Sequence, residues 1–208
     1  MGGGFRSDRT SAREGSLLGV QTCAPRLLRA AATPSAAATH RAAAAHGLDP
    51  AQALASLARE DLAHVDADGR PTVVYPFSAT SRGHRVLIDG AKVVEAMCAL
   101  DALGIGPMLN VPIEISSRDP ISGGEIQVRL GIDQEASWQP RSAAVLAGST
   151  RCDGPSFCGC CDVLNFFETT ANAQRYLLEH PDVSGSPISI PEAIEAGRVV
   201  FGDVLKGD

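Results

Sequence analysis

A strongly apolar segment runs from Lys92 to Leu103 and ends at three helix-breaking residues, Gly104, Gly106 and Pro107. Its composition predicts a helix that is apolar on most sides, and such a helix must be covered by other elements. Hydrophobic residues make up 44% of the 208-residue chain, which is enough to build that cover. The segment therefore constrains the chain to a globular fold with a substantial core.

The residues after this segment predict a sheet with helices beside it. Apolar and polar residues alternate in the clearest strand, where Ile126, Val128 and Leu130 face one side. Strands are expected at three places, residues 113–115, 125–132 and 142–147. Helices are expected at residues 170–178 and from Pro191 onward. Together these predict an α+β catalytic domain over residues 90–208, with a mixed or antiparallel sheet and flanking helices.

The first part of the chain carries weaker signals. Residues 1–35 are rich in Gly, Ser, Ala and Arg and are expected to form a weakly ordered tail. Residues 36–89 predict a small winged-helix-like module. Its expected parts are a helix at 37–45, a helix from Asp49-Pro50 to about Val65, a turn at Asp68-Gly69, and flanking strands at 72–75 and 85–88.

Charge and composition narrow the classes of partner. The net charge of -6 gives no overall basic surface for nucleic acid, and Arg59 is followed by Glu60 and Asp61, which repel phosphate. Nucleic-acid binding is therefore not expected. No apolar run approaches the ~20 residues that a membrane span needs. The cysteine usage, without a convincing secretion signal, predicts a reducing cytoplasm, where clustered cysteines indicate metal or thiol chemistry.

Cys98 and Asp101 lie three positions apart in the apolar segment, a spacing that places two side chains on one face of a helix. A carboxylate in apolar surroundings is costly unless it is paired or used. Its desolvation should raise its pKa, so that it can accept and return protons near neutral pH, with the nearby thiol as donor. The alternative is a buried cysteine beside a helix-capping or ion-paired aspartate.

A second group of thiols, Cys158, Cys160 and Cys161, falls within four residues and precedes an apolar stretch. Structural zinc is less favoured, because the histidines are scattered and no second pair of cysteines follows at a suitable spacing. Soft ions such as Hg(II) or Cu(I) accept two or three thiolates. The second group together with Cys98 could supply them.

Both segments resemble the signatures of one known family. Residues 96–103 resemble the first signature of the organomercurial (alkylmercury) lyases, in which a cysteine and an aspartate lie three apart. Cys161 with residues 165–167, Asn-Phe-Phe, resembles the second signature. Residues 75–78 and 84–86 are similar to the wing-and-linker region of actinobacterial-type members. The resemblance extends from about residue 36 to the end of the sequence.

The resemblance implies a fold, an activity and roles for the residues. Cys98 and a cysteine of the second segment would bind mercury as thiolates, and Asp101 would pass a proton from a cysteine to the leaving carbon. Organomercurial compounds would be the substrates. A hydrocarbon would depart, and Hg(II) would remain as a product held by the two sulfurs and Asp101. No cofactor is required, and small thiols or a mercuric reductase would accept the mercury.

The second catalytic thiol is open between two cysteines. The distance to Phe166 favours Cys161, whereas the Ser156-Phe157 match favours Cys158 with an insertion after it. We prefer Cys161, because its spacing needs no gap. Cys158 and Cys160 remain candidate mercury ligands, and Cys160 is either a thiol that passes mercury onward or an inert neighbour. Asp119 stands where the family often carries a further cysteine.

Two other functions compete with the lyase hypothesis. A thiolate-based carrier of Cu(I) or Hg(II) would use the same cysteines, but it has no need for a carboxylate such as Asp101 beside them. A metal-responsive regulator built on the winged helix would require a basic recognition helix. Residues 50–65 do not show one.

Overall fold

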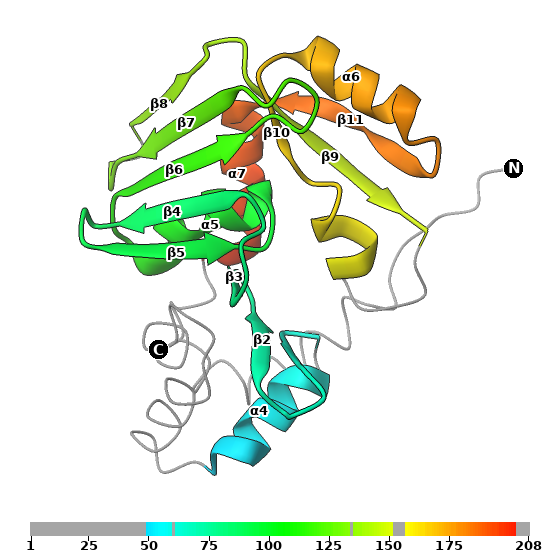
Figure 1. Cartoon of the computed structure of the whole chain (residues 1–208). Helices are drawn as coiled ribbons and strands as arrows, with labels where there is room; N and C mark the ends of the chain where they lie inside the picture. Colours follow the sequence, from blue (N-terminus) through cyan, green and yellow to red (C-terminus); the bar gives the residue numbers. More distant parts are fainter. Residues whose placement is uncertain (1–48, 60, 134, 152–156, 203–208) are drawn as a thin grey trace, which may run out of the picture.

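The computed structural model describes residues 49–59, 61–133, 135–151 and 157–202 (Figure 1). The α-helices within these ranges are α4 (Pro50–Arg59), α5 (Ala99–Leu109), α6 (Thr170–Glu179) and α7 (Ile190–Phe201). None of these helices combines the length and the apolar character needed to cross a membrane. The tail expected at residues 1–35 and the helix expected at 37–45 lie outside the described residues.

The larger sheet has eight strands in the order β1-β2-β3-β5-β4-β6-β7-β8. Every neighbouring pair in it is antiparallel. Its strands are β1 (Ala63–Val65), β2 (Pro71–Val74), β3 (Phe77–Ser78), β4 (His84–Ile88), β5 (Lys92–Ala96), β6 (Ile113–Arg118), β7 (Glu125–Leu130) and β8 (Ala136–Gln139). Only β4 and β5 depart from chain order, so most of the sheet is a meander of hairpins.

A smaller antiparallel sheet has the order β10-β9-β11. Its strands are β9 (Ala144–Thr150), β10 (Phe166–Phe167) and β11 (Val183–Ser189), and a single π-helical turn, η1 (Phe157–Cys161), precedes β10. Figure 1 shows α6 beside this sheet. The α+β class is confirmed, the sheet is antiparallel rather than mixed, and the helix expected at 170–178 is confirmed as α6. Strands β8, β10 and β11 were not predicted.

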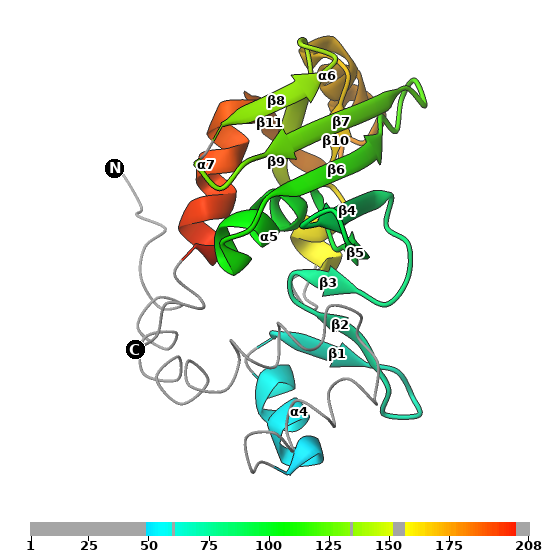
Figure 2. The ribbon, with the colours of Figure 1, turned by 90° about the vertical axis from the view of Figure 1, so that its left-hand side faces the viewer.

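The core lies between the larger sheet and the helix pair α5 and α7, which Figure 2 shows running beside one another. Leu103 and Ile105 of α5 are fully buried with Val86 of β4. The helices approach closely because Gly197 of α7 faces α5: a Cβ there would lie 3.0 Å from the backbone nitrogen of Gly104. Helix α5, which carries most of the first signature, is therefore packed between the larger sheet and α7.

The helix expected from Lys92 to Leu103 is wrong in both of its boundaries. Residues 92–96 form strand β5, and the helix begins at Ala99 and runs through the glycines and Pro107 to Leu109. Val93 and Val94 are β-branched and favour a strand. Gly104 and Gly106 lie inside the helix and do not end it. Their missing side chains leave room for Phe201 of α7 and for Ile113.

The N-terminal part contains a helix and a hairpin, as expected, but with different partners. Asp49 caps α4 by accepting a hydrogen bond from the Gln52 amide at 2.8 Å. The helix ends at Arg59 rather than near Val65, and residues 63–65 form β1. Strand β1, not β4, pairs with β2 across the Asp68-Gly69 turn. Strand β4 instead pairs with β5 and β6.

The hairpin is continuous with the rest of the sheet. Phe77 of β3 pairs with Ala96 of β5, so hydrogen bonds run without a break from β1 to β8. The domain boundary expected at residues 89 and 90 lies in the tight turn between β4 and β5. The winged-helix module stays a prediction, since its first expected helix lies outside the described residues.

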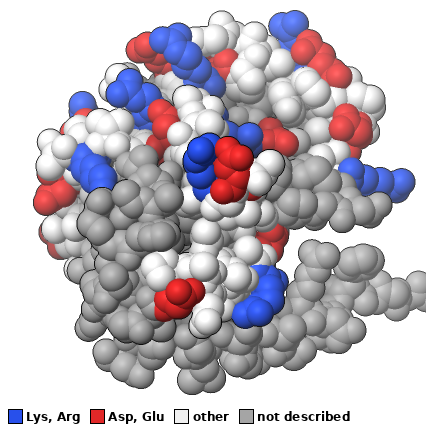
Figure 3. All heavy atoms as spheres, turned by 60° about the horizontal axis from the view of Figure 1, so that its bottom comes forward, with Lys and Arg blue, Asp and Glu red and all other residues white. Residues whose placement is uncertain are grey.

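Charged side chains are mixed over the face that carries α4. Figure 3 shows Lys and Arg interspersed with Asp and Glu there, and no continuous basic area forms among the described residues of that face. A surface that binds phosphate backbones gathers positive charge. This face gives no support to nucleic-acid binding.

Asp119 joins the end of β6 to the smaller sheet. Its Oδ1 accepts hydrogen bonds from the amides of Ile121 and Ser122, and its Oδ2 accepts from the Glu168 amide and the Asn172 side chain. The side chain is only 1% exposed. Burial alone would raise the pKa of Asp119, but these hydrogen bonds outweigh it and hold the pKa below its ordinary value.

We expect Asp119→Asn to lower the free energy of unfolding at pH 7 by about 2 kcal/mol, because the amide cannot accept from all four donors. The folded-state pKa is depressed, so the carboxylate stabilises the fold above its unfolded pKa of about 3.9 and this contribution is lost as the pH falls through the folded pKa. Urea denaturation of both proteins at pH 7 and in steps from pH 4 to pH 2 measures the effect. A difference that does not shrink between pH 4 and pH 2 would contradict the argument.

Candidate active site

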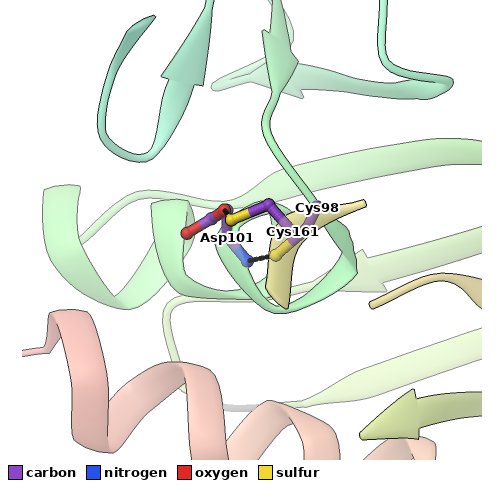
Figure 4. A group of neighbouring side chains, drawn as sticks. All are labelled: Cys98, Asp101 and Cys161. Carbon is purple, nitrogen blue, oxygen red and sulfur yellow. Dashed lines mark hydrogen bonds between the residues drawn. The ribbon is translucent and has the colours of Figure 1, made fainter. Parts of the chain in front are cut away.

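Cys98 occupies the N-cap of α5, where strand β5 gives way to the helix. Its backbone is extended, and its Sγ accepts a hydrogen bond from the Asp101 amide at 3.4 Å (Figure 4). The side chain is 2% exposed. An N-cap is normally Ser, Thr, Asp or Asn, because an oxygen accepts from the first free amides. A thiol in this place is held in one position by the start of the helix.

Asp101 lies in the first turn of α5 and is 5% exposed. Burial raises its pKa to about 7, although hydrogen bonds with Cys98 and Cys161 act in the opposite direction. The carboxyl group therefore changes protonation state near neutral pH, which suits a group that both accepts and donates protons. The pKa of the Cys98 thiol is raised well above its ordinary value, first by burial and then by Cys161 and Asp101.

Cys161 comes from the far end of η1 and reaches the same point. Its Sγ lies 3.8 Å from Oδ2 of Asp101 and 3.7 Å from the hydroxyl oxygen of Tyr75. One ligand atom each from Cys98, Asp101 and Cys161 lies within 4.8 Å of the others, and all three residues are buried. Figure 4 shows the three side chains converging from α5 and η1.

Apolar side chains surround these groups and keep water away. Val73 and Met97 pack with the two cysteines in one cluster, and the half-buried Tyr75, Leu100 and Leu164 pack against it. Burial and then the neighbouring Cys161 raise the pKa of Tyr75 far above its ordinary value, so its hydroxyl keeps its proton. A dry site strengthens electrostatic interactions between the reacting groups.

The structure brings Cys98, Asp101 and Cys161 together. Cys160 is half-buried and does not belong to the three-residue group, and the side chain of Cys158 lies outside the described residues. The preference for Cys161 over Cys158 stays a prediction, because only the side chain of Cys161 is described. Tyr75 was not predicted as a site residue. It was noticed only within the segment 75–78, and nothing in that segment indicated a contact with Cys161.

A pocket of about 530 Å³ adjoins the site on the side of the β1–β2 hairpin. Val73 and Met97 belong both to its lining and to the cysteine cluster. Arg82 also lines this pocket and forms an ion pair with the carboxylate of Asp162, the residue that follows Cys161.

The arrangement supports a specific chemistry. Two sulfurs within reach of one another offer the ligands that soft metals with few coordination sites prefer. A carboxyl group with a pKa of about 7 lies beside both sulfurs, so a proton can move between sulfur, oxygen and a third atom held at the same point. The arrangement is suited to soft-metal binding combined with proton transfer.

Comparison with known proteins gives matches to alkylmercury lyases. The family model described as MerB, alkylmercury lyase, matches residues 77–202. The alkylmercury lyase of Staphylococcus epidermidis is 28% identical over 134 residues, which are 64% of this chain and 60% of that protein. The corresponding protein of Streptomyces lividans is 26% identical over 125 residues, 60% of this chain and 57% of that protein. That of Bacillus cereus is 30% identical over 118 residues, 56% of this chain and 52% of that protein. The matches thus span 60% or less of the length of these curated relatives.

One solved structure shares the fold over nearly the whole chain. The mercury-bound form of MerB2 superposes with a TM-score of 0.72 and covers 96% of this chain and 100% of its own. The sequence identity is 18%, so this likeness concerns the fold alone.

Proposed function

The chain belongs to the alkylmercury lyase family, and from that premise we propose that it cleaves carbon–mercury bonds by protonolysis. The observation that carries the proposal is the buried group of Cys98, Asp101 and Cys161, whose ligand atoms lie within 4.8 Å of one another. The proposed substrates are organomercurial compounds, and the products are a hydrocarbon and Hg(II). No further cofactor is needed for this reaction.

The first steps attach the substrate to sulfur. The Cys98 sulfur displaces the group that accompanies mercury in R–Hg–X, and its proton leaves with X. Cys161 then adds its sulfur to mercury and gives its proton to Asp101, whose Oδ2 lies 3.8 Å from that sulfur. Two thiolates on mercury push electron density toward the carbon, which becomes basic enough to be protonated.

The second part breaks the carbon–mercury bond. The Asp101 carboxyl group gives its proton to the carbon, the electron pair of the carbon–mercury bond forms the new carbon–hydrogen bond, and the hydrocarbon departs. Asp101 is again a carboxylate, so the proton count closes over the cycle. A donor with a pKa of about 7, held beside the reacting carbon, gains from proximity as well as from its matched acidity.

Product release completes the proposed cycle. Hg(II) stays between the two sulfurs with the Asp101 carboxylate beside it. Small external thiols or a mercuric reductase would then take the ion by thiolate exchange. Both cysteines are buried, so the accepting thiol must pass between the apolar side chains around them before it can reach mercury.

Release of benzene from phenylmercury tests the proposal. The purified protein is incubated with phenylmercury and an excess of a small thiol, and benzene is followed by gas chromatography. We expect benzene in proportion to enzyme and time, and none beyond background without protein. A protein that binds mercury or Cu(I) through its thiols but releases no benzene would be a soft-metal carrier instead.

A further inference from the structure

The two cysteines of the site are held in different ways. Cys98 is fixed by the helix that it caps. Cys161 ends a single turn of five residues, and the backbone bonds from the Val163 and Leu164 amides to the Cys160 carbonyl stay within that segment. Two backbone bonds tie the end of the segment to its neighbours, from the Ala99 amide to the Leu164 carbonyl at 2.9 Å and from the Leu146 amide to the Asn165 carbonyl at 3.0 Å. Both bonds fix residues that follow Cys161, so the position of the Cys161 sulfur also depends on side-chain contacts.

Tyr75 supplies the first of these contacts. It lies between β2 and β3, and its hydroxyl oxygen is 3.7 Å from the Cys161 sulfur. The backbone around it is anchored twice, by the Tyr75 amide to the Leu62 carbonyl and by the Met97 amide to the Pro76 carbonyl, each at 3.0 Å. The ring also meets His64 edge-on, with centroids 6.0 Å apart. The hydroxyl is thus presented to Cys161 by a fixed part of the sheet.

Arg82 supplies the second contact from the same stretch of chain. It lies in the connection between β3 and β4, and its guanidinium group is paired with the carboxylate of Asp162. Asp162 directly follows Cys161. Segment 75–82 therefore holds Cys161 at two points, one at its sulfur and one at the next residue.

We propose that Tyr75 and Arg82 are positioning residues that hold the Cys161 sulfur beside Asp101 and Cys98. The inference rests on the proposed function and extends it to residues outside the three-residue group. Tyr75 also lies before residue 77, where the match to the family model begins. A thiol side chain has three staggered orientations about its first torsion, and a hydrogen bond to one of them favours it.

The chemical role follows from the donors and acceptors. In the thiol form, Cys161 donates to the Tyr75 oxygen or to Asp101. Once its proton has moved to Asp101, the sulfur is only an acceptor, and the Tyr75 hydroxyl turns to donate to it. One lone pair of the sulfur is thereby directed at Tyr75, and another remains for mercury.

Tyr75→Phe tests the first contact, because it removes the hydroxyl and keeps the ring. We expect the single-turnover rate constant for benzene release to fall about tenfold, the loss of roughly one hydrogen bond to a charged group. The KM for phenylmercury should change less than about threefold, since Cys98 still captures the substrate. A single-turnover rate constant does not depend on the fraction of folded protein, so simple destabilisation would leave it unchanged.

A charge reversal tests the second contact. We expect Arg82→Asp and Asp162→Arg each to lower the same rate constant about threefold, and the double variant to recover most of the loss. Recovery requires that the pair acts through its mutual attraction rather than through either side chain alone. A wild-type rate constant in Tyr75→Phe, or a double variant no faster than the single ones, would overturn the inference.

A second measurement separates this inference from the proposed function. Proteins loaded with Hg(II) alone are compared by X-ray absorption, which counts the sulfurs bound to mercury. We expect two sulfurs in the wild type and a lower average in Tyr75→Phe. Absence of benzene from the wild type would overturn the lyase proposal. Equal sulfur counts in the two proteins would overturn the positioning role, whether or not benzene is released.

Discussion

Replacement of Asp101 by Asn is expected to lower the turnover of phenylmercury about a thousandfold while Hg(II) binding is retained. The amide has the size of the carboxyl group but cannot carry a proton to the leaving carbon, and general acid catalysis of this kind typically contributes a factor of about 10² to 10⁴. Both sulfurs remain, so mercury is still captured. Benzene release and retention of Hg(II) after gel filtration measure the two effects separately.

The same variant should be more stable than the wild type in alkaline solution. Burial raises the pKa of Asp101 from 3.8 to about 7, so the fold favours the protonated form. The stability associated with that proton is present below the unfolded pKa and is lost as the pH rises through about 7. At ~1.4 kcal/mol for each pKa unit, the free energy of unfolding of the wild type falls by about 4 kcal/mol between a pH below 3.8 and pH 8. The amide variant does not titrate and loses none of this stability.

Urea denaturation at pH 5 and pH 8 checks this expectation, and Asp133→Asn serves as a control because Asp133 is exposed. The stability advantage of Asp101→Asn over the wild type should grow from pH 5 to pH 8, and that of the control should not. Turnover at the wild-type rate in Asp101→Asn would remove Asp101 from the mechanism.

Replacement of Cys98 by Ser is expected to abolish both mercury binding and turnover, with a loss of at least about 10⁴ in rate. A hydroxyl oxygen is a hard ligand and binds mercury poorly, whereas a thiolate is soft. The change should not harm the fold, because Cys98 is the N-cap of α5 and Ser is a preferred residue at that position. The loss can therefore be assigned to the missing sulfur.

Thermal unfolding tests whether the fold of Cys98→Ser is unharmed. Retention of mercury in the presence of a small thiol tests whether mercury binding is lost. The comparison is Cys160→Ser, which we expect to keep mercury and to turn over substrate, because Cys160 lies outside the three-residue group. A Cys98→Ser protein with full activity would refute the mechanism. An equal loss in Cys160→Ser would mean that this sulfur is the second ligand.

The sequence identified Cys98 and Asp101 as a pair, but for a different geometric reason than the structure gives. The spacing suggested two side chains on one face of a long helix. In the structure Cys98 precedes the helix and caps it. The error arose because a short apolar run does not distinguish strand from helix. Asp89-Gly90, with positive φ at both residues, was the hairpin signal that marks β4 and β5.

Other parts of the structure had little local signal. Residues 183–189 contain Gly, Ser and Pro and do not alternate clearly, yet they pair with β9 along their whole length. Their pairing depends on the close approach of Gly185 to Gly148, where a Cβ would lie 2.5 Å from the neighbouring Cα. Tyr75 and Cys161 are 86 residues apart in the sequence. Their contact follows from the topology of the sheet, which residue patterns alone did not specify.

The unbroken hydrogen bonding from β1 to β8 has a practical consequence for shortened forms of this protein. Residues 77 and 78 pair with the end of β5. A chain that began after them would leave that part of β5 as an open edge, with free amide and carbonyl groups and the exposed Val93 on the same strand. Open edges of this kind recruit strands from other molecules and lead to aggregation. A chain shortened at its N-terminus to begin after residue 78 should therefore aggregate rather than form a smaller enzyme.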